Sequence, residues 1–367
     1  MSEASHLLFI QKRSLRAGAQ TSLARMVGST PLRDLNPAVL VGTEGWLHQD
    51  LKDRAFPVAL TEFPSPRAIM TRLLGYGAFA RRASAKLAEV GIRPGAIIAN
   101  DHQECPLALA LSARLGGVPV LGILRTPGMD RRDFKKYACE NCDGLMGEGV
   151  ELNERVQTWT DKQTALFEEG FCEEEFFPPV PFPSVFPSRI LVVGSESPRK
   201  GFGDFIEALD LIESREPAFP GLRCDFTGTI PVGLESLVAR PRRSQFIFLG
   251  RVEGFAKLVR NYPLAIHPSR AETFGMAPIE AMLAGVPTMV SATGIAATLP
   301  LPTTWIFEPA SPKKIAERLT ELWRRWVDHA LDVAAVQQHI RACYHIDHTA
   351  GFVRESLVRI GAARPLK

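Results

Sequence analysis

The sequence predicts an α/β protein of two domains, each with a parallel β-sheet covered by helices on both faces. Short apolar runs alternate with longer segments of helical period through most of the chain, which is the pattern of repeated βα units. A proline-rich stretch at 176–187 interrupts this alternation near the middle. The chain has 367 residues, 46% of them hydrophobic and 23% charged, which is enough for two apolar cores.

The first domain is expected over residues 1–180, and its strands are short apolar runs. A short helix is expected at 20–27. A second helix, at 107–115, should end at Gly116-Gly117, because glycine commonly follows a helix C-terminus. The expected strands are His6–Gln11, Ala38–Gly42, Ala96–Ala99 and Val118–Leu124.

The second domain is expected over residues 188–340, after the proline-rich stretch. A C-terminal helix within 341–367 follows, with Asp347 or Thr349 as its N-cap; we favour this helix start over a metal site for His345-Ile-Asp347-His348. The expected strands are Arg189–Gly194, Arg223–Gly228, Phe246–Leu249, Leu264–Pro268 and Thr288–Ser291, and the expected helices are Phe205–Glu213 and Ala277–Ala284.

Composition excludes several classes of function. The net charge of +3 gives no general attraction to nucleic acid, and no apolar run approaches the roughly 20 residues of a membrane span. The N-terminus lacks the features of a signal peptide, so a cytoplasmic protein is expected. Cys139-Glu-Asn-Cys142 has no second ligand pair nearby and follows no strand, which favours buried structural cysteines over zinc or redox chemistry.

The segment 264–291 contains the most informative chemistry. A strand ends at His267-Pro268, a polar loop carries Glu272, and a helix with Pro278 in its first turn carries Glu280. The start of a helix presents unpaired N–H groups and a positive dipole end, which suit a phosphate. Each glutamate alone could be an ordinary acid of a first helical turn. Two carboxylates beside such a helix start fit a ligand with both hydroxyls and phosphates, as in a sugar nucleotide.

The whole segment resembles the E-x7-E signature of the family 4 glycosyltransferases, through Glu272, Phe274-Gly275, Glu280-Ala-Met282 and Gly285-Val-Pro287. These are retaining enzymes of the GT-B fold, with two facing Rossmann-like domains, that use nucleotide sugars. The resemblance implies that residues 1–180 form the acceptor-side domain, that 188–340 bind the nucleotide sugar, and that a helix within 341–367 crosses back to the N-terminal domain. The resemblance implies that Glu272, with the backbone of Thr273, Phe274 and Gly275, holds the donor sugar. It implies that Glu280 binds the ribose.

Further segments resemble the family in order and spacing. Arg199-Lys200-Gly201, after the strand that ends at Gly194, resembles the family's KG element, so Lys200 and Arg199 are expected to stabilise the departing diphosphate. Ser195 stands where the family usually has arginine. Ile230 replaces the second glycine of a G-x-G-P turn, and the turn at 250–252 is expected to hold the base through Val252.

The first half resembles the family more weakly. Gly18 lies in a segment like the family's glycine-rich loop near the donor phosphates, and His102 lies in a strand-end loop like the family's histidine loop, which makes it a candidate catalytic residue. Two positions depart from the family pattern: Arg125 stands where many members have histidine, and Glu169 replaces an asparagine.

The predicted function is metal-independent transfer of a sugar from a nucleotide-diphosphate sugar to a hydroxyl of a glycan or lipid-linked acceptor, in bacterial envelope polysaccharide synthesis. No cofactor is implied, and the chain has no Asp-x-Asp motif. One alternative is a non-catalytic nucleotide-sugar-binding or scaffolding relative. A glycosidase would also use two carboxylates, but it has no use for the basic Arg199-Lys200 loop.

The basic, apolar-studded stretch 67–82 could lie on an anionic membrane, although a solvated helix face is the commoner reason for such a pattern. A weak peripheral contact at the inner membrane face is therefore a further expectation.

Overall fold

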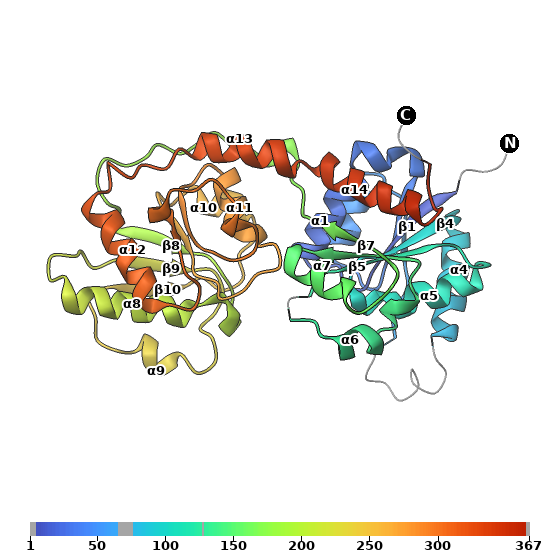
Figure 1. Ribbon diagram of the computed structural model, residues 1–367, viewed down its shortest axis with the longest axis horizontal. Helices are drawn as coiled ribbons and strands as arrows, with labels where there is room; N and C mark the ends of the chain where they lie inside the picture. Colours follow the sequence, from blue (N-terminus) through green and yellow to red (C-terminus); the bar gives the residue numbers. More distant parts are fainter. Residues whose placement is uncertain (1–4, 65–75, 127, 365–367) are drawn as a thin grey trace. The chain divides into compact units, whose positions relative to one another are not determined.

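The computed structural model describes residues 5–64, 76–126 and 128–364. The chain divides into two compact units: unit 1 is Met1–Phe171 with Tyr344–Lys367, and unit 2 is Cys172–Cys343. Each unit contains one parallel sheet, of seven strands in unit 1 and six in unit 2 among the described residues. The predicted architecture of two α/β domains is confirmed (Figure 1).

The sheet of unit 1 has the strand order β3-β2-β1-β4-β5-β6-β7, and every neighbouring pair is parallel. Its central strands are buried on both faces, which explains why they are uninterrupted apolar runs in the sequence. The strands are β1 His6–Gln11, β2 Pro37–Val41, β3 Val58–Leu60, β4 Pro94–Ala99, β5 Val120–Leu124, β6 Gly144–Glu148 and β7 Gln163–Phe167.

The helices of unit 1 cover its sheet in two groups. Helices α1, α2 and α14 pack together, and α4 packs against α5 (Figure 1). The α-helices are α1 Gly18–Val27, α2 Trp46–Asp53, α4 Gly77–Glu89, α5 Cys105–Arg114, α6 Arg131–Lys136, α7 Val150–Gln157 and α14 Ile346–Arg359, and the 3-10 helices are η1 Thr30–Leu35, η2 His102–Glu104 and η3 Cys139–Asn141.

The sheet of unit 2 has the strand order β10-β9-β8-β11-β12-β13. The strands are β8 Arg189–Val192, β9 Arg223–Phe226, β10 Gln245–Phe248, β11 Ala265–His267, β12 Thr288–Ser291 and β13 Ile306–Phe307. The α-helices are α8 Phe202–Arg215, α9 Glu235–Val238, α10 Phe255–Val259, α11 Met276–Leu283, α12 Pro312–Arg324 and α13 Val333–Tyr344, and the 3-10 helices are η4 Glu173–Glu175, η5 Pro198–Lys200, η6 Gly294–Ala297 and η7 Thr303–Trp305.

The proline-rich stretch 176–187 contains no helix or strand and packs within unit 2. Phe182 stacks on Trp326 at 4.3 Å between ring centroids, and the Trp326 indole donates to Pro183 O at 2.7 Å. The Phe177 amide donates to the carbonyl of Leu283, the last residue of helix α11, and the Val180 amide donates to the carbonyl of Gly285 just beyond it. These contacts explain why the chain passes from unit 1 to unit 2 at Phe171–Cys172, ahead of this stretch.

The start of helix α14 corrects one expectation. The N-cap is His345, whose ring nitrogen accepts from the amide of Asp347, and not Asp347 or Thr349. The Asp347 carboxylate instead accepts from the Thr30 amide at 3.0 Å, so it ties the helix to η1. The expected helix is therefore present, but it begins at Ile346.

Candidate functional site

The candidate site lies at the carboxyl edge of the sheet of unit 2, where strands β8 and β11 are neighbours. The chain leaves β8 toward η5, which carries Arg199 and Lys200, and it leaves β11 toward the loop that carries Glu272. Parallel neighbours end at the same edge of a sheet, so these two loops meet although they are about 70 residues apart in sequence.

Glu272 receives both cations of the other loop. Lys200 Nζ lies 2.6 Å from Glu272 Oε1, and Arg199 Nη1 lies 3.0 Å from Glu272 Oε2. We call Arg199, Lys200 and Glu272 the Glu272 triad. The carboxylate is buried, with 8% of its side chain exposed, whereas 18% of the Lys200 and 36% of the Arg199 side chain is exposed. The cations are therefore the part of the triad that a ligand can reach.

The electrostatics keep Glu272 ionised. Burial by itself raises the pKa of Glu272, but the charge and hydrogen bond of Lys200 outweigh burial and lower the pKa to about 2. A carboxylate with such a pKa accepts hydrogen bonds at neutral pH and cannot donate a proton. The triad therefore has a net charge of +1 near pH 7.

His267, the last residue of β11, lies beneath the triad. Burial lowers the pKa of His267 to about 4, and the Lys200 and Arg199 charges act in the same direction against the opposing pull of Glu272. Its Nε2 is 3.4 Å from Glu272 Oε1 but is not aligned for a hydrogen bond. At neutral pH the imidazole is thus uncharged, and the charge of Glu272 is balanced by the two cations.

Backbone contacts hold the two loops together independently of the triad. The Arg270 amide donates to Arg199 O at 2.7 Å, and the Arg270 guanidinium pairs with Asp204 through bonds of 2.6 and 2.7 Å. Gly201 has φ +70°, and a Cβ there would lie 1.8 Å from Pro268 O, so only glycine fits. The triad rests on a scaffold that its own side chains do not provide.

The chain continues from the triad into helix α11. Gly275 has φ +91° and precedes the first helical residue, Met276. The Phe274 carbonyl accepts from the Ile295 amide at 2.8 Å, and a Cβ on Gly294 would lie 2.3 Å from that carbonyl. Thr273, Phe274 and Gly275 therefore lie between the triad and the helix start, as a donor-binding segment requires. Glu280 is half-buried in the second turn of the helix.

Two other predicted donor residues lie in neighbouring loops of unit 2. Ser195 follows β8, and a Cβ on Gly228, which has φ +104°, would lie 3.0 Å from Ser195 Cα. Gly228 and Gly250 exchange two backbone hydrogen bonds, of 2.7 and 3.0 Å. Val252 follows this bridge and is half-buried. The structure thus places the predicted residues of unit 2 in segments that follow the strands of one sheet, with Glu280 on helix α11, while their individual roles stay predictions.

The predicted residues Gly18 and His102 belong to unit 1. Gly18 is the exposed first residue of α1. His102 begins η2 at the end of β4, and its Nδ1 lies 2.7 Å from Asp101 Oδ1 and 3.2 Å from Thr126 Oγ1. The pair with His102 lowers the pKa of Asp101 against the effect of burial. Because Nδ1 is engaged, Nε2 is the nitrogen that a substrate could use.

Sequence reasoning missed a buried ion cluster at the carboxyl edge of unit 1. Arg125 donates to Asn100 O and Oδ1, both at 2.9 Å, and pairs with Glu148 and Glu169. Its guanidinium also lies 4.3 Å from the Phe167 ring centroid. We call Arg125, Glu148 and Glu169 the Arg125 cluster. The two departures from the family pattern, Arg125 and Glu169, therefore face each other. The sequence signal for this cluster was that the departures at Arg125 and Glu169 both introduce a charged side chain.

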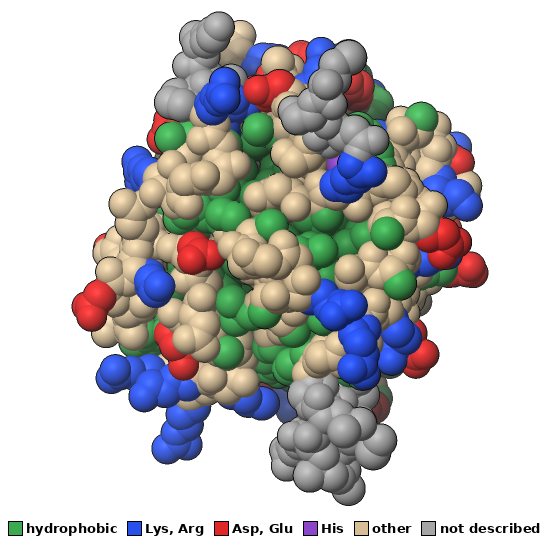
Figure 2. Space-filling view, turned by 90° about the vertical axis from the view of Figure 1, so that its right-hand side faces the viewer, with side chains coloured by type: hydrophobic (Ala, Val, Ile, Leu, Met, Phe, Trp, Pro, Cys, Tyr) green, Lys and Arg blue, Asp and Glu red, His purple; other side chains and the backbone are tan. Residues whose placement is uncertain are grey.

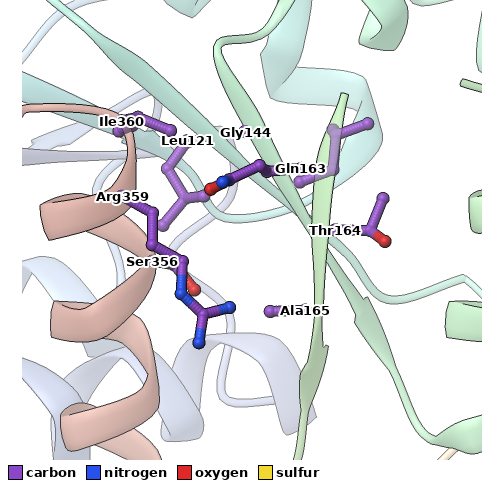
Figure 3. A pocket seen from close by; sticks show the side chains of 9 residues that line it. Leu121, Gly144, Gln163, Thr164, Ala165, Ser356, Arg359 and Ile360 are labelled. Carbon is purple, nitrogen blue, oxygen red and sulfur yellow. The ribbon is translucent and has the colours of Figure 1, made fainter. Parts of the chain in front are cut away.

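Other parts of the described structure offer weaker candidates for a functional site. Cys139 and Cys142 are buried, in agreement with a structural role, and among the described residues no group of three or more metal-binding side chains converges. No helix in the described ranges is long and apolar enough to cross a membrane. A hollow of about 10 Å³ lies under α14 at the opposite, amino-terminal end of strands β5 to β7 (Figure 3). Gly144, Gln163 and Ile360 help to line it, and it has room for roughly one water molecule.

Comparisons with known proteins agree with this architecture. Residues 187–325 match the family model described as Glycosyl transferases group 1. No curated protein sequence matches the chain. Among solved structures, HepE from Anabaena in complex with UDP-glucose is 17% identical with a TM-score of 0.75, over 96% of this chain and 99% of that chain.

Two further structures show the same likeness. Sucrose-phosphate synthase from Thermosynechococcus elongatus is 16% identical with a TM-score of 0.71, over 98% of this chain and 100% of that chain. The lipopolysaccharide outer core galactosyltransferase WaaB is 15% identical with a TM-score of 0.70, over 96% and 99% of the two chains. At these identities the likeness establishes the fold. Residues 187–325, which hold the Glu272 triad, thus match the group 1 glycosyl transferase model within a chain of GT-B fold.

Proposed function

We propose that the chain is a retaining, family 4 glycosyltransferase that transfers a sugar from a nucleotide-diphosphate sugar to a hydroxyl of a glycan or lipid-linked acceptor. The observation that carries the proposal is the Glu272 triad in a group 1 domain. Two partly exposed cations and an ionised carboxylate lie side by side at the carboxyl edge of a parallel sheet, where such sheets bind their ligands. A diphosphate needs the cations, and sugar hydroxyls need the carboxylate.

In this proposal Lys200 and Arg199 stabilise the negative charge that develops on the leaving diphosphate. Glu272 accepts hydrogen bonds from the donor sugar, with the backbone of Thr273–Gly275 beside it, and Glu280 binds the ribose. Ser195 and Val252 contribute to the nucleotide site from their loops, and Gly18 approaches the donor phosphates. His102 contacts the reacting sugar through Nε2.

No metal ion takes part in the proposed reaction, because Lys200 and Arg199 supply the positive charge that a leaving diphosphate requires. EDTA should therefore leave turnover unchanged. A loss of turnover in EDTA that Mg²⁺ restores would contradict this part of the proposal.

The state of Glu272 argues against the glycosidase alternative. A glycosidase needs one carboxylic acid with a raised pKa to protonate the leaving group. The pKa of Glu272 is lowered to about 2, so it is ionised throughout the physiological range. Lys200, whose charge lowers this pKa, and the neighbouring Arg199 also match a diphosphate, which a glycosidase substrate lacks.

A non-catalytic nucleotide-sugar-binding relative remains the second candidate, since Ser195 and Ile230 depart from the family pattern. Calorimetric titration with UDP-, GDP- and ADP-sugars, followed by an assay of nucleotide release with acceptor extracts, separates the two. Binding with acceptor-dependent release of nucleotide is expected. Binding of a donor without release in any extract would favour the scaffold, and no binding of any donor would contradict both.

We further propose an acceptor presented at a membrane in envelope polysaccharide synthesis, met by a weakly attached peripheral protein. Of the four arginines in the basic stretch, Arg81 and Arg82 are exposed on α4, and Arg67 and Arg72 lie outside the described residues. The face of unit 1 in Figure 2 has Lys and Arg side chains along its lower rim and mainly hydrophobic and uncharged groups at its centre.

Co-sedimentation with anionic liposomes tests the membrane proposal. Each basic residue near an anionic surface adds about 1 kcal/mol, which salt screens. The wild type should sediment at low salt and be released at high salt, and a variant with Arg67, Arg72, Arg81 and Arg82 changed to Gln should sediment less. A wild type that stays in solution at low salt would point to a soluble acceptor.

A further inference from the structure

The two cations assigned to the diphosphate are in direct contact with the carboxylate assigned to the sugar. Lys200 and Arg199 bind separate oxygens of Glu272, at 2.6 and 3.0 Å. Each oxygen therefore has its own cation. A diphosphate that approaches this edge must compete with an ionised carboxylate for both of its partners.

The burial of Glu272 gives this competition an energetic consequence. Only 8% of the Glu272 side chain is exposed, and a buried carboxylate that loses its partners is strongly destabilised unless other donors replace them. His267 does not replace them in this geometry, because its Nε2 lies 3.4 Å from Glu272 Oε1 without alignment for a hydrogen bond. A free nucleoside diphosphate lacks the transferred sugar, whose hydroxyls are the donors proposed for this carboxylate, and its ribose hydroxyls are assigned to Glu280. An intact sugar donor brings hydroxyl groups, which can donate to Glu272 as the cations move to the phosphates.

We propose that Glu272 is a specificity-determining residue that makes the site prefer the intact sugar donor over the free nucleoside diphosphate, because it competes with the diphosphate for Lys200 and Arg199. The inference rests on the proposed function, and it adds that the site distinguishes the intact sugar donor from the free nucleoside diphosphate. It also gives a reason for product release: once the sugar has been transferred, the carboxylate regains the two cations and displaces the nucleoside diphosphate.

The scaffold of the site makes the inference testable by substitution. The loops of Arg199 and Glu272 are joined by the Arg270 amide, by the pair of Arg270 with Asp204 and by the close approach at Gly201. None of these contacts uses the Glu272 carboxylate. Glu272→Gln should therefore remove the competing charge while the two cations stay at the sheet edge.

Calorimetric titration of the full-length wild type and Glu272→Gln with UDP and UDP-glucose tests the proposal, with the GDP and ADP pairs as further probes. In the variant, the free diphosphate should bind on the order of tenfold tighter, the equivalent of one charge-assisted hydrogen bond, and the sugar donor should not. The ratio of the two dissociation constants should therefore shift by about tenfold or more toward the free diphosphate.

Two matched variants control for simpler explanations. Glu196→Gln removes the same charge from an exposed position in the β8–η5 loop and should leave the ratio within about twofold, because a solvent-exposed charge is screened. Glu272→Ala removes the acceptor as well as the charge and should shift the ratio in the same direction. It keeps the test open if the Gln variant does not fold, as judged by circular dichroism.

The outcomes separate the inference from the proposed function. A wild type that binds none of the nucleotides or sugar nucleotides overturns both. A wild type that binds both members of a pair, with an unchanged ratio in the Glu272 variants, overturns the inference and leaves the proposed function standing.

Discussion

The Glu272 triad and the Arg125 cluster each place three charged side chains at the same kind of position, the carboxyl edge of a parallel sheet, but they differ in how accessible their cations are. In the Arg125 cluster the exposed fractions are 4% for Arg125, 9% for Glu148 and 1% for Glu169. In the triad the carboxylate is similarly buried, but 36% of Arg199 and 18% of Lys200 is exposed. The difference indicates that an anionic ligand can replace the carboxylate only where the paired cations are accessible, so ion pairs alone do not identify a binding site.

The Arg125 cluster also shows how two departures from the family pattern that the sequence resembles fit into one structure. Arg125 holds the strand-end segment before His102, since it donates to both oxygens of Asn100 while its own amide lies 3.4 Å from Asp101 Oδ1. Glu169 supplies the negative charge that a buried arginine requires. The two changes thus compensate each other within unit 1.

The largest effect is expected on stability, when the buried Arg125 is replaced. Arg125→Met removes the cation that pairs with the buried Glu169, so it should lower the free energy of unfolding by about 3–5 kcal/mol in urea denaturation. Arg324→Met, which breaks a surface pair with Glu216, is the matched control and should cost at most about 1 kcal/mol. If the two variants were equally stable, the contrast between a buried cluster and a surface pair would fail.

The next effect is on catalysis. Lys200→Ala should lower turnover by about 10²–10³, because it removes charge stabilisation from the leaving diphosphate. Its free energy of unfolding should fall by less than the roughly 3–5 kcal/mol expected when a buried charge loses its partner outright, since Arg199 still pairs with Glu272. Lys313→Ala, at an exposed position on α12, provides the control for both measurements. Unchanged turnover of Lys200→Ala on an identified donor would contradict the role of the triad.

A smaller effect is expected from acid. The pKa of His267 is lowered to about 4 in the folded chain, so the unfolded chain binds a proton first as the pH falls through 6.5. Stability should therefore fall between pH 6.5 and 4, by about 2 kcal/mol at pH 5 relative to pH 7.5. His267→Gln should lose less over this interval in urea denaturation. Parallel losses in both proteins would show that His267 is not the group responsible.

The sequence predicted the fold class because buried parallel strands are uninterrupted apolar runs, as in β1, β4 and β8. It missed the short edge strands β3 and β13, of three and two residues, which are too brief to show a pattern. It also missed β7 at the other edge of the sheet of unit 1, whose QTALF sequence is only partly buried. Strand order, which brings β8 beside β11, depends on long-range packing that no local pattern records.

The residues of the candidate site could be predicted from the sequence, but the contacts between them could not. The two loops of the triad follow predicted strands and match a family motif, so Lys200, Arg199 and Glu272 could be selected before their contacts were known. Their mutual ion pairs could not, because they join positions 72 and 73 residues apart. Arg125 and Glu169 looked like isolated departures, because only the pairing of β5, β6 and β7 brings the ends of these strands together.

The proposed binding of the sugar donor by the Glu272 triad can be tested by a crystal structure of the protein with bound UDP-glucose. The GDP or ADP donor takes its place if calorimetry selects that one. We expect a diphosphate within hydrogen-bond distance of Lys200 Nζ and Arg199, with the Glu272 carboxylate accepting hydrogen bonds from sugar hydroxyls. A diphosphate bound elsewhere, with both cations still paired to Glu272, would contradict the proposed binding.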